Sequence, residues 1–206
     1  MTAPVVATAL LVERLALRGP LAPTRVVATG MGAGQVRRHR SRLQGPLLTA
    51  GLAGGVAAGV RPGDIVVADE VVLPHGRRIA IPSAPALAQA VRRRGLTVHV
   101  GPVAATQGVT TGPAREALAR QGILAVDMES GAFAEIADGR PFAVVRAVVD
   151  TADHPLLRLG TVLRGTRALR NLRRAAPALL EWTQAVGNRD VVLAAPRSFC
   201  AGVERA

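Results

Sequence analysis

Short apolar runs alternate along the chain with segments of helical or polar character. The apolar runs are rich in Val, Ala and Leu, which is typical of strands buried on both faces of a sheet. Strands that alternate with helices at this spacing predict an α/β fold. We expect a three-layer sandwich, with a central mixed, largely parallel sheet and helices on both of its faces.

The pattern places the expected elements as follows. Strands are predicted over residues 5–10, 25–29, 46–51, 65–68, 97–104, 123–126 and 142–149. Helices are predicted over residues 35–43, 85–94, 114–120, 129–137 and 158–183, with a short helix after the first strand. Residues 30–34 are predicted as a glycine-rich loop, and residues 73–85 as a longer loop rich in Pro, Gly and Arg. Residues 52–56 are a small-residue stretch at the end of a strand, where either a flat ligand can approach the backbone closely or the chain makes a tight turn.

The predicted helix 158–183 is amphipathic. Leu172 and Leu179 belong to its apolar stripe, while Arg167, Arg170 and Arg173 lie on or near the opposite face. A solvated outer face explains this pattern, and a peripheral contact with anionic lipid headgroups is the alternative.

The chain is strongly basic, with a formal net charge of +12. All 26 basic residues are Arg, and Ala, Gly, Val and Pro are abundant, which indicates a general compositional bias. Aromatic content of 2% leaves few platforms on which bases could stack. We therefore expect no specific binding of nucleic acid.

The remaining composition narrows the class of protein. No apolar run is long enough to span a membrane, and the N-terminus lacks the basic region of a signal peptide, so we expect a cytoplasmic protein. The single Cys200 excludes an internal disulfide and offers no spacing typical of a metal site. We expect neither a metal nor a cofactor.

An acidic cluster occupies residues 123–150. Asp127, Glu129 and Asp150 stand directly at the ends of apolar runs, where a carboxylate loses solvation unless it has a partner. These acids are therefore suited to bind or protonate a ligand, and strand-end capping is the alternative. Ligands of such sheets bind at the carboxyl ends of strands, where residues 30–34 and 52–56 are also expected.

Four motifs in this order resemble the nucleoside phosphorylase and nucleosidase superfamily, most visibly methylthioadenosine/adenosylhomocysteine nucleosidases and hopanoid-associated phosphorylases. The motifs are Thr29-Gly30-Met31-Gly32; Gly51-Leu52-Ala53-Gly54-Gly55 with the Val60–Val67 segment VRPGDIVV; Val126-Asp127-Met128-Glu129-Ser130; and the segment VRAVVDTAD at residues 145–153. The resemblance covers about residues 5–182. It implies cleavage of a purine N-glycosidic bond.

The resemblance also implies roles for individual residues. Asp150 matches the acid that donates toward purine N7, and Glu129 the carboxylate that accepts hydrogen bonds from the ribose hydroxyls. Met128 is expected to pack against the sugar, and Asp127 belongs to the same motif with a structural role favoured. Glu13 matches the glutamate that activates the attacking water, with a plain helix charge as the alternative.

Other positions complete the predicted site or depart from the family. Gly32, Ala53, Gly54 and Thr106 are expected to line it. The nucleosidases commonly carry serine at the positions of Leu52 and Val149, and an aromatic residue in the loop that matches residues 105–110. We therefore expect base binding that is either weaker or differently built.

Water and inorganic phosphate both remain open as the nucleophile. Phosphorolysis needs an anion site, for which the loop 30–34 with Arg37, Arg38 or Arg40 is the sequence candidate, because glycine lets backbone N–H groups approach a phosphate. Phosphate is thus a possible co-substrate.

The last segment resembles the start of the isoprenoid-pathway enzyme that reduces hydroxymethylbutenyl diphosphate. Residues 190–206 include Cys200, which matches an iron–sulfur ligand of that enzyme, but one cysteine cannot hold a cluster. We therefore expect a nucleosidase-like domain over residues 1–186, and a linker with a truncated reductase-like start over residues 187–206.

These resemblances together favour release of adenine from adenosylhopane in hopanoid biosynthesis. The first alternative is cleavage of methylthioadenosine or adenosylhomocysteine, and the second is a non-catalytic basic module that docks on a membrane. The expected partners are a purine nucleoside or an adenosyl-lipid substrate, and further copies of the chain in a homodimer or higher homo-oligomer.

Overall fold

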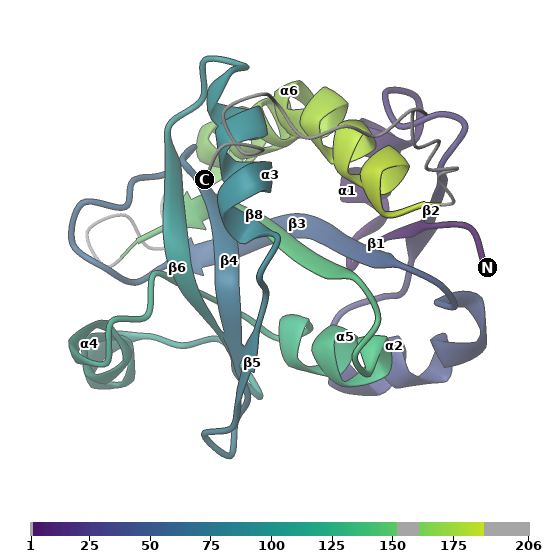
Figure 1. Ribbon diagram of the computed structural model, residues 1–206. Coiled ribbons are helices and arrows are strands. Elements are labelled where there is room, and N and C mark those ends of the chain that lie inside the picture. The colour runs from purple at the N-terminus through teal and green to yellow at the C-terminus, as the bar shows by residue number, and fades with distance from the viewer. Residues whose placement is uncertain (1, 152–160, 188–206) are drawn as a thin grey trace, which may run out of the picture.

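The computed structural model describes residues 2–151 and 161–187 (Figure 1). The strands are β1 (Val5–Thr8), β2 (Arg25–Ala28), β3 (Leu47–Gly55), β4 (Ile65–Val72), β5 (Arg78–Ala80), β6 (Val98–Ala105), β7 (Ala125–Asp127) and β8 (Phe142–Asp150). The helices are α1 (Leu11–Arg18), α2 (Ala33–Arg38), the 3-10 turn η1 (Arg40–Arg42), α3 (Ala84–Arg92), α4 (Gly112–Arg120), α5 (Ser130–Ala137) and α6 (Thr161–Val186).

All eight strands belong to one mixed sheet. Its order is β2-β1-β3-β7-β6-β4-β5, and β8 pairs with both β3 and β4. The pairs β1–β2, β1–β3, β3–β8, β4–β6 and β6–β7 are parallel, whereas β3–β7, β4–β5 and β4–β8 are antiparallel. Because β8 joins β3 to β4 on one side and β7 and β6 join them on the other, these five strands close a ring.

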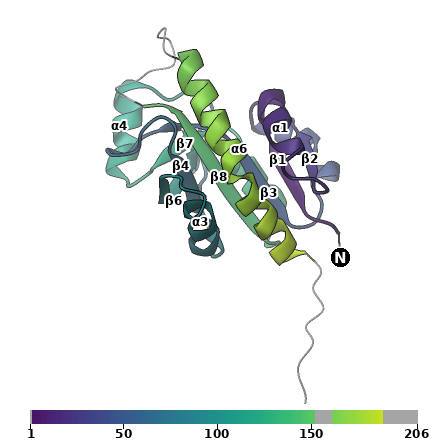
Figure 2. The ribbon, with the colours of Figure 1, turned by 90° about the horizontal axis from the view of Figure 1, so that it is seen from above.

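Helices cover both faces of the sheet. Helices α1, α3 and α6 lie on one face and α2 and α5 on the other, while α4 stands at one end of the ring (Figure 1). Seen from above, α6 crosses the sheet between α1 and α3, and it packs on β8 (Figure 2). The predicted fold class is thereby confirmed.

The last helix buries one stripe and exposes its arginines. Leu172, Ala176 and Leu179 are fully buried, whereas Arg170 and Arg173 are exposed, as the amphipathic pattern predicts. The predicted start at residues 158–160 lies outside the described residues. Among the described residues, no helix combines the length and apolar character needed to cross a membrane.

The small residues 52–56 do not form a tight turn, which is one of the two interpretations of this stretch. They continue β3 as far as Gly55. The backbone of this stretch is paired with β8 on one side and, at Gly54 and Gly55, with β7 on the other. Hydrogen bonding to two neighbours thus holds in the sheet a segment whose glycines suggest a turn.

The predicted loop 73–85 is also wrong in part, because it contains β5. This strand pairs with β4 in a hairpin, and Arg78 of β5 forms an ion pair with Glu70 of β4. Strand β4 therefore runs beyond its predicted end at Ala68, and its pairing with β6 is shifted by a bulge between Ala68 and Val71.

The reductase-like segment, residues 188–206, lies outside the described residues, so that interpretation and the proposed division at residue 187 stay predictions.

Trp182 anchors α6 and gives the first testable prediction. Its side chain is 6% exposed, and its indole N–H donates to Ser83 Oγ at 3.2 Å. We expect Trp182→Ala to lower the free energy of unfolding by about 3–5 kcal/mol, because apolar burial is lost and a cavity is left behind. Urea denaturation followed by far-UV circular dichroism measures this, with exposed Arg173→Ala as the control. Equal losses in the two variants would contradict the packing described.

Candidate functional site

A cavity of about 270 Å³ opens where β1, β7 and β8 reach their carboxyl ends. It brings together most of the residues predicted for the site from sequence, which come from distant parts of the chain. These are Glu13, Ala53, Gly54, Thr106, Asp127, Met128, Glu129 and Asp150. Gly32 does not line the cavity but contacts it through Glu129.

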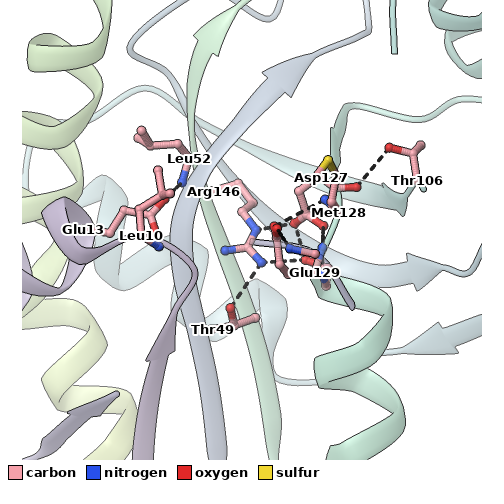
Figure 3. Close-up of polar contacts among 11 residues, drawn as sticks. Leu10, Glu13, Thr49, Leu52, Thr106, Asp127, Met128, Glu129 and Arg146 are labelled. Carbon is pink, nitrogen blue, oxygen red and sulfur yellow. Dashed lines mark hydrogen bonds and ion pairs between the residues drawn. The ribbon is translucent and has the colours of Figure 1, made fainter. Parts of the chain in front are cut away.

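Arg146 lies at the centre of the site, between Glu13 and the segment Asp127–Glu129 (Figure 3). It projects from β8 and is 2% exposed. Its Nε donates to Asp127 Oδ2, and its Nη2 donates to Ser130 Oγ at 2.8 Å and to Thr49 Oγ1 at 3.1 Å. One guanidinium thus connects β8 with β7, β3 and the start of α5.

Asp127 uses both carboxylate oxygens within the protein. Oδ1 accepts the backbone N–H groups of Glu129 at 3.0 Å and Ser130 at 2.8 Å, and Oδ2 accepts Ser130 Oγ–H as well as Arg146 Nε–H. These bonds cap the first turn of α5. The geometry agrees with a structural role for Asp127. It also fixes the position of Glu129, two residues further along the chain.

Glu129 is held by backbone N–H groups. Its Oε1 accepts the N–H of Gly32 at 2.6 Å, and Oε2 accepts that of Met128 at 3.3 Å. The N–H of Gly32 is available because its φ of 86° turns the loop before α2 toward the carboxylate. Burial, together with the nearby charge of Asp127, raises the pKa of Glu129 above its ordinary value.

Glu13 joins α1 to β3. Its Oε2 accepts the N–H of Leu10 at 2.8 Å, its Oε1 accepts that of Leu52 at 2.7 Å, and the residue is 2% exposed. Burial raises the pKa of this carboxyl, even though the two hydrogen bonds and Arg146 act in the opposite direction. A carboxylate whose pKa is raised accepts a proton more readily than an ordinary glutamate does.

Glycine in β3 gives these charged groups their space. A Cβ on Gly51 would stand 2.8 Å from Glu13 Oε1 and 3.0 Å from Arg146 Nη1. Any larger residue at this position would push the carboxylate and the guanidinium apart. Gly51, the last residue of the strand predicted over residues 46–51, therefore serves the site through its lack of a side chain.

Asp150 stands at the end of β8, opposite Gly54. The register between β3 and β8 shifts between Ala53 and Gly54, which brings Asp150 level with Gly54. Its Oδ2 accepts a hydrogen bond from Arg115 Nη2 at 2.7 Å, and both residues are 5% exposed. The predicted purine acid is thus one half of a buried ion pair.

One rim of the cavity is formed by the loop after β6. Thr106 N–H donates to the backbone oxygen of Asp127 at 2.7 Å, and Thr106 Oγ1 donates to that of Gly108 at 2.9 Å. Val109 and Met31 line the cavity nearby and are 74% and 63% exposed. The rim is therefore ordered by backbone hydrogen bonds and presents apolar side chains.

The arginines proposed for a phosphate site do not line this cavity. Arg37 pairs with Glu135 of α5 at 3.0 Å and lines a second cavity of about 320 Å³, while Arg38 and Arg40 are exposed. The N–H of Gly32 is taken by Glu129. Among the described residues, no group of three His, Cys, Asp or Glu side chains is arranged to hold a metal ion.

Two residues that line the candidate site were not identified from the sequence. Arg146 had a signal, since it is a single charge inside the apolar strand Phe142–Asp150. Arg115 had none, because it belongs to a short helix whose other charged residues, Glu116 and Arg120, are exposed.

A sequence model of the phosphorylase superfamily matches residues 16–181. A search of curated protein sequences finds no match. One similar solved structure is a 5'-methylthioadenosine/S-adenosylhomocysteine nucleosidase of Helicobacter pylori in complex with a substituted pyrrolidin-3-ol. Its TM-score is 0.72 at 17% identity, and the match covers 89% of this chain and 98% of that chain.

Two further structures have the same fold. The corresponding nucleosidase of Neisseria meningitidis, in complex with methylthio-immucillin-A, gives a TM-score of 0.70 at 19% identity, over 88% of this chain and 100% of that chain. Futalosine hydrolase of Helicobacter pylori gives 0.70 at 17% identity, over 89% of this chain and 97% of that chain.

The buried pair Asp127–Arg146 predicts a large loss of stability in Asp127→Asn. The substitution keeps the shape but leaves the guanidinium of Arg146 without its counter-charge, so we expect the free energy of unfolding to fall by about 3–5 kcal/mol. Glu135→Gln, which breaks the exposed pair with Arg37, is the control and should cost less than about 1 kcal/mol. Urea denaturation of the three proteins measures both, and similar losses would refute the central role of Arg146.

Burial of Glu13 predicts a dependence of stability on pH. Its pKa in the folded protein lies above the usual 4.5, so between these two values the folded state holds a proton that the unfolded chain has released. The free energy of unfolding contributed by this residue therefore falls as pH rises from 4.5 through the raised pKa. Glu13→Gln cannot titrate, so the stability of the wild type minus that of the variant should decrease with rising pH. A difference that stays constant or increases, in denaturation series from pH 4.5 upward, would contradict the raised pKa.

Proposed function

Because the chain belongs to the phosphorylase superfamily, we propose that it cleaves the N-glycosidic bond of a purine nucleoside whose leading candidate is adenosylhopane. The family and the fold support an enzyme that cleaves an N-glycosyl bond. The observation that carries the proposal is the convergence of Glu13, Glu129 and Asp150 on one cavity.

Each acid suits a different part of such a substrate. Cleavage passes through a ribosyl group with cationic, oxocarbenium-like character, which must be held rigidly while the base departs. Glu129 is fixed at the start of α5, and a carboxylate can accept two ribose O–H groups. Met128 lies beside it and would pack on the sugar, while Asp150, at the end of β8, would face the base.

Glu13 suits activation of an attacking water. Both of its oxygens are positioned by backbone N–H groups, and burial raises its pKa toward the range of an effective general base. The arginines that would form a phosphate site lie outside the cavity, which favours hydrolysis over phosphorolysis in this proposal.

The cavity rim suits an apolar group on the sugar. Met31 and Val109 line the cavity as exposed apolar side chains, and Leu11, Val12 and Leu15 of α1 are 47–59% exposed. A nucleoside that carries a hydrocarbon chain could cover such surface. The exposed arginines of α6 would in addition suit delivery of this substrate from an anionic membrane.

Methylthioadenosine or adenosylhomocysteine is the second candidate substrate. The observation in its favour is the similarity in fold to nucleosidases of that name. A methylthio group is a smaller apolar substituent and also fits beside Met31 and Val109.

We expect the protein to release adenine from adenosylhopane in vesicles, and Asp150→Asn to lower the rate by about 100-fold or more. Adenine is measured by chromatography, with and without phosphate, and the sugar product distinguishes hydrolysis from phosphorolysis. No adenine above the Asp150→Asn control would refute the lipid substrate. Turnover of methylthioadenosine without lipid would favour the second candidate.

A protein that cleaves none of these nucleosides but binds anionic vesicles in a salt-sensitive manner would instead be a docking module. A homo-oligomeric state is part of the proposal, and sedimentation of the full chain tests it.

A further inference from the structure

Arg115 reaches the cavity from an otherwise solvent-facing helix. Helix α4 stands at one end of the ring (Figure 1), and Arg115 is its one fully buried residue. The side chain is 6% exposed and lines the cavity with Asp150, to which its Nη2 donates at 2.7 Å. A long cationic side chain has thus been brought from the surface to the part of the site that faces the base.

The hydrogen-bonding capacity of Arg115 is not filled. In the part of the chain that the structure describes, its Nε is the one buried side-chain nitrogen or oxygen without a hydrogen-bond partner. This nitrogen is itself enclosed by the protein, so a ligand in the cavity would meet other N–H groups of the side chain. A guanidinium has five N–H donors, and the hydrogen bond to Asp150 uses one donor of Nη2, so further donors are left for an acceptor on a ligand.

Strand β3 accommodates the pair through Gly54. A Cβ at this position would collide with Arg115 Nη2 and stand 3.1 Å from Asp150 Oδ1. The absence of a side chain here lets the guanidinium and the carboxylate lie side by side against the strand.

The ion pair changes what Asp150 can do. A carboxylate bound to a guanidinium only accepts hydrogen bonds, whereas the guanidinium only donates them. We propose, on the basis of the function proposed above, that Arg115 is a catalytic residue that donates an N–H to purine N7, while Asp150 accepts an N–H of the 6-amino group. The pair would then both select the base and help it to leave.

An adenine ring presents the complement of this pair. Along one edge it offers the N6 donor next to the N7 acceptor, the pattern that a side-chain amide reads with one acceptor and one donor. Asp150 and Arg115 offer the same acceptor and donor from two residues. A 6-oxopurine has acceptors at both O6 and N7, so its O6 would face the carboxylate of Asp150. The pair should therefore discriminate against hypoxanthine and guanine.

The bond changes are simple with Arg115 as donor. The C1′–N9 bond breaks and its electron pair remains on the base, while an oxygen of water bonds to C1′ and Glu13 takes the proton that this water loses. The hydrogen bond from Arg115 stabilises the negative charge that spreads to N7. The base takes its proton from solvent after it leaves, so Asp150 remains a carboxylate throughout.

The test compares Arg115→Ala with Arg120→Ala, an exposed arginine on the same helix. On the adenine nucleoside that the wild type cleaves, Arg115→Ala should lower kcat by about 100- to 1,000-fold, the usual effect of removing one such donor. On 4-nitrophenyl riboside, whose leaving group needs no help, the same variant should stay within a few-fold of the wild type, which also shows that it is folded. Arg120→Ala should resemble the wild type on both substrates.

Base selection gives an independent measurement. The wild type should prefer the adenine nucleoside over its 6-oxo counterpart by about 100-fold or more in kcat/KM. In calorimetry, the wild type should bind free adenine more tightly than hypoxanthine. Arg115→Ala removes the donor to N7, an acceptor that both bases carry, so it should weaken the binding of adenine and keep the preference, whereas Asp150→Asn should lose the preference because an amide can also donate to O6.

The outcomes separate the two proposals. A wild type that cleaves no nucleoside and no nitrophenyl riboside would refute the proposed function, and a loss of adenine affinity in Arg115→Ala, measured by calorimetry, would still test the role of Arg115. A wild type that releases adenine, with Arg115→Ala equally active and binding adenine equally tightly, would overturn the assignment of Arg115 alone. Equal loss on both substrates would likewise overturn it, because Arg115 would then act on the fold and not on the base.

Discussion

The site depends on one buried ion pair, between Arg146 of β8 and Asp127 of β7. The Nη2 of the same guanidinium donates to Thr49 of β3 and Ser130 of α5, so that three strands and a helix meet at one charge. A charge buried so deeply is tolerated only with full pairing, and here the pairing also sets geometry. Asp127 caps α5, and this cap holds Glu129 at the wall of the cavity.

The four buried acids of the site fall into two classes. Asp127 and Asp150 each lie against a guanidinium, whereas Glu13 and Glu129 are held through backbone N–H groups. Burial raises the pKa of Glu13 and of Glu129 above its ordinary value. Carboxyl groups that lie in one cavity are thus held by two kinds of partner, guanidinium groups for one pair and backbone N–H groups for the other.

The fold class could be predicted from the sequence because short apolar strands alternate with helices. The acids could be identified as candidate site residues because a carboxylate at the end of a buried strand loses solvation and requires a partner. It failed where a residue's meaning depends on a distant partner. The glycines of β3 look like a turn until β7 and β8 pair with them. Arg115 looks like a surface charge until its side chain is seen to reach Asp150 at the end of β8. Neither fact is local, so no pattern within the segment could reveal it.

The departures from the nucleosidase pattern become intelligible through the backbone of β3. At Leu52, where the related enzymes commonly have serine, it is the main-chain N–H that binds Glu13, and any residue except proline can supply it. Two positions along the same strand, the lack of a side chain at Gly54 admits the pair of Arg115 and Asp150. The strand thus contributes a donor and a space, and the charged groups beside it in the cavity, Arg115 and Asp150, come from α4 and β8. A cavity wall that lacks the side chains common in related enzymes can therefore still hold charged groups, because the strand between them carries no side chain at Gly54.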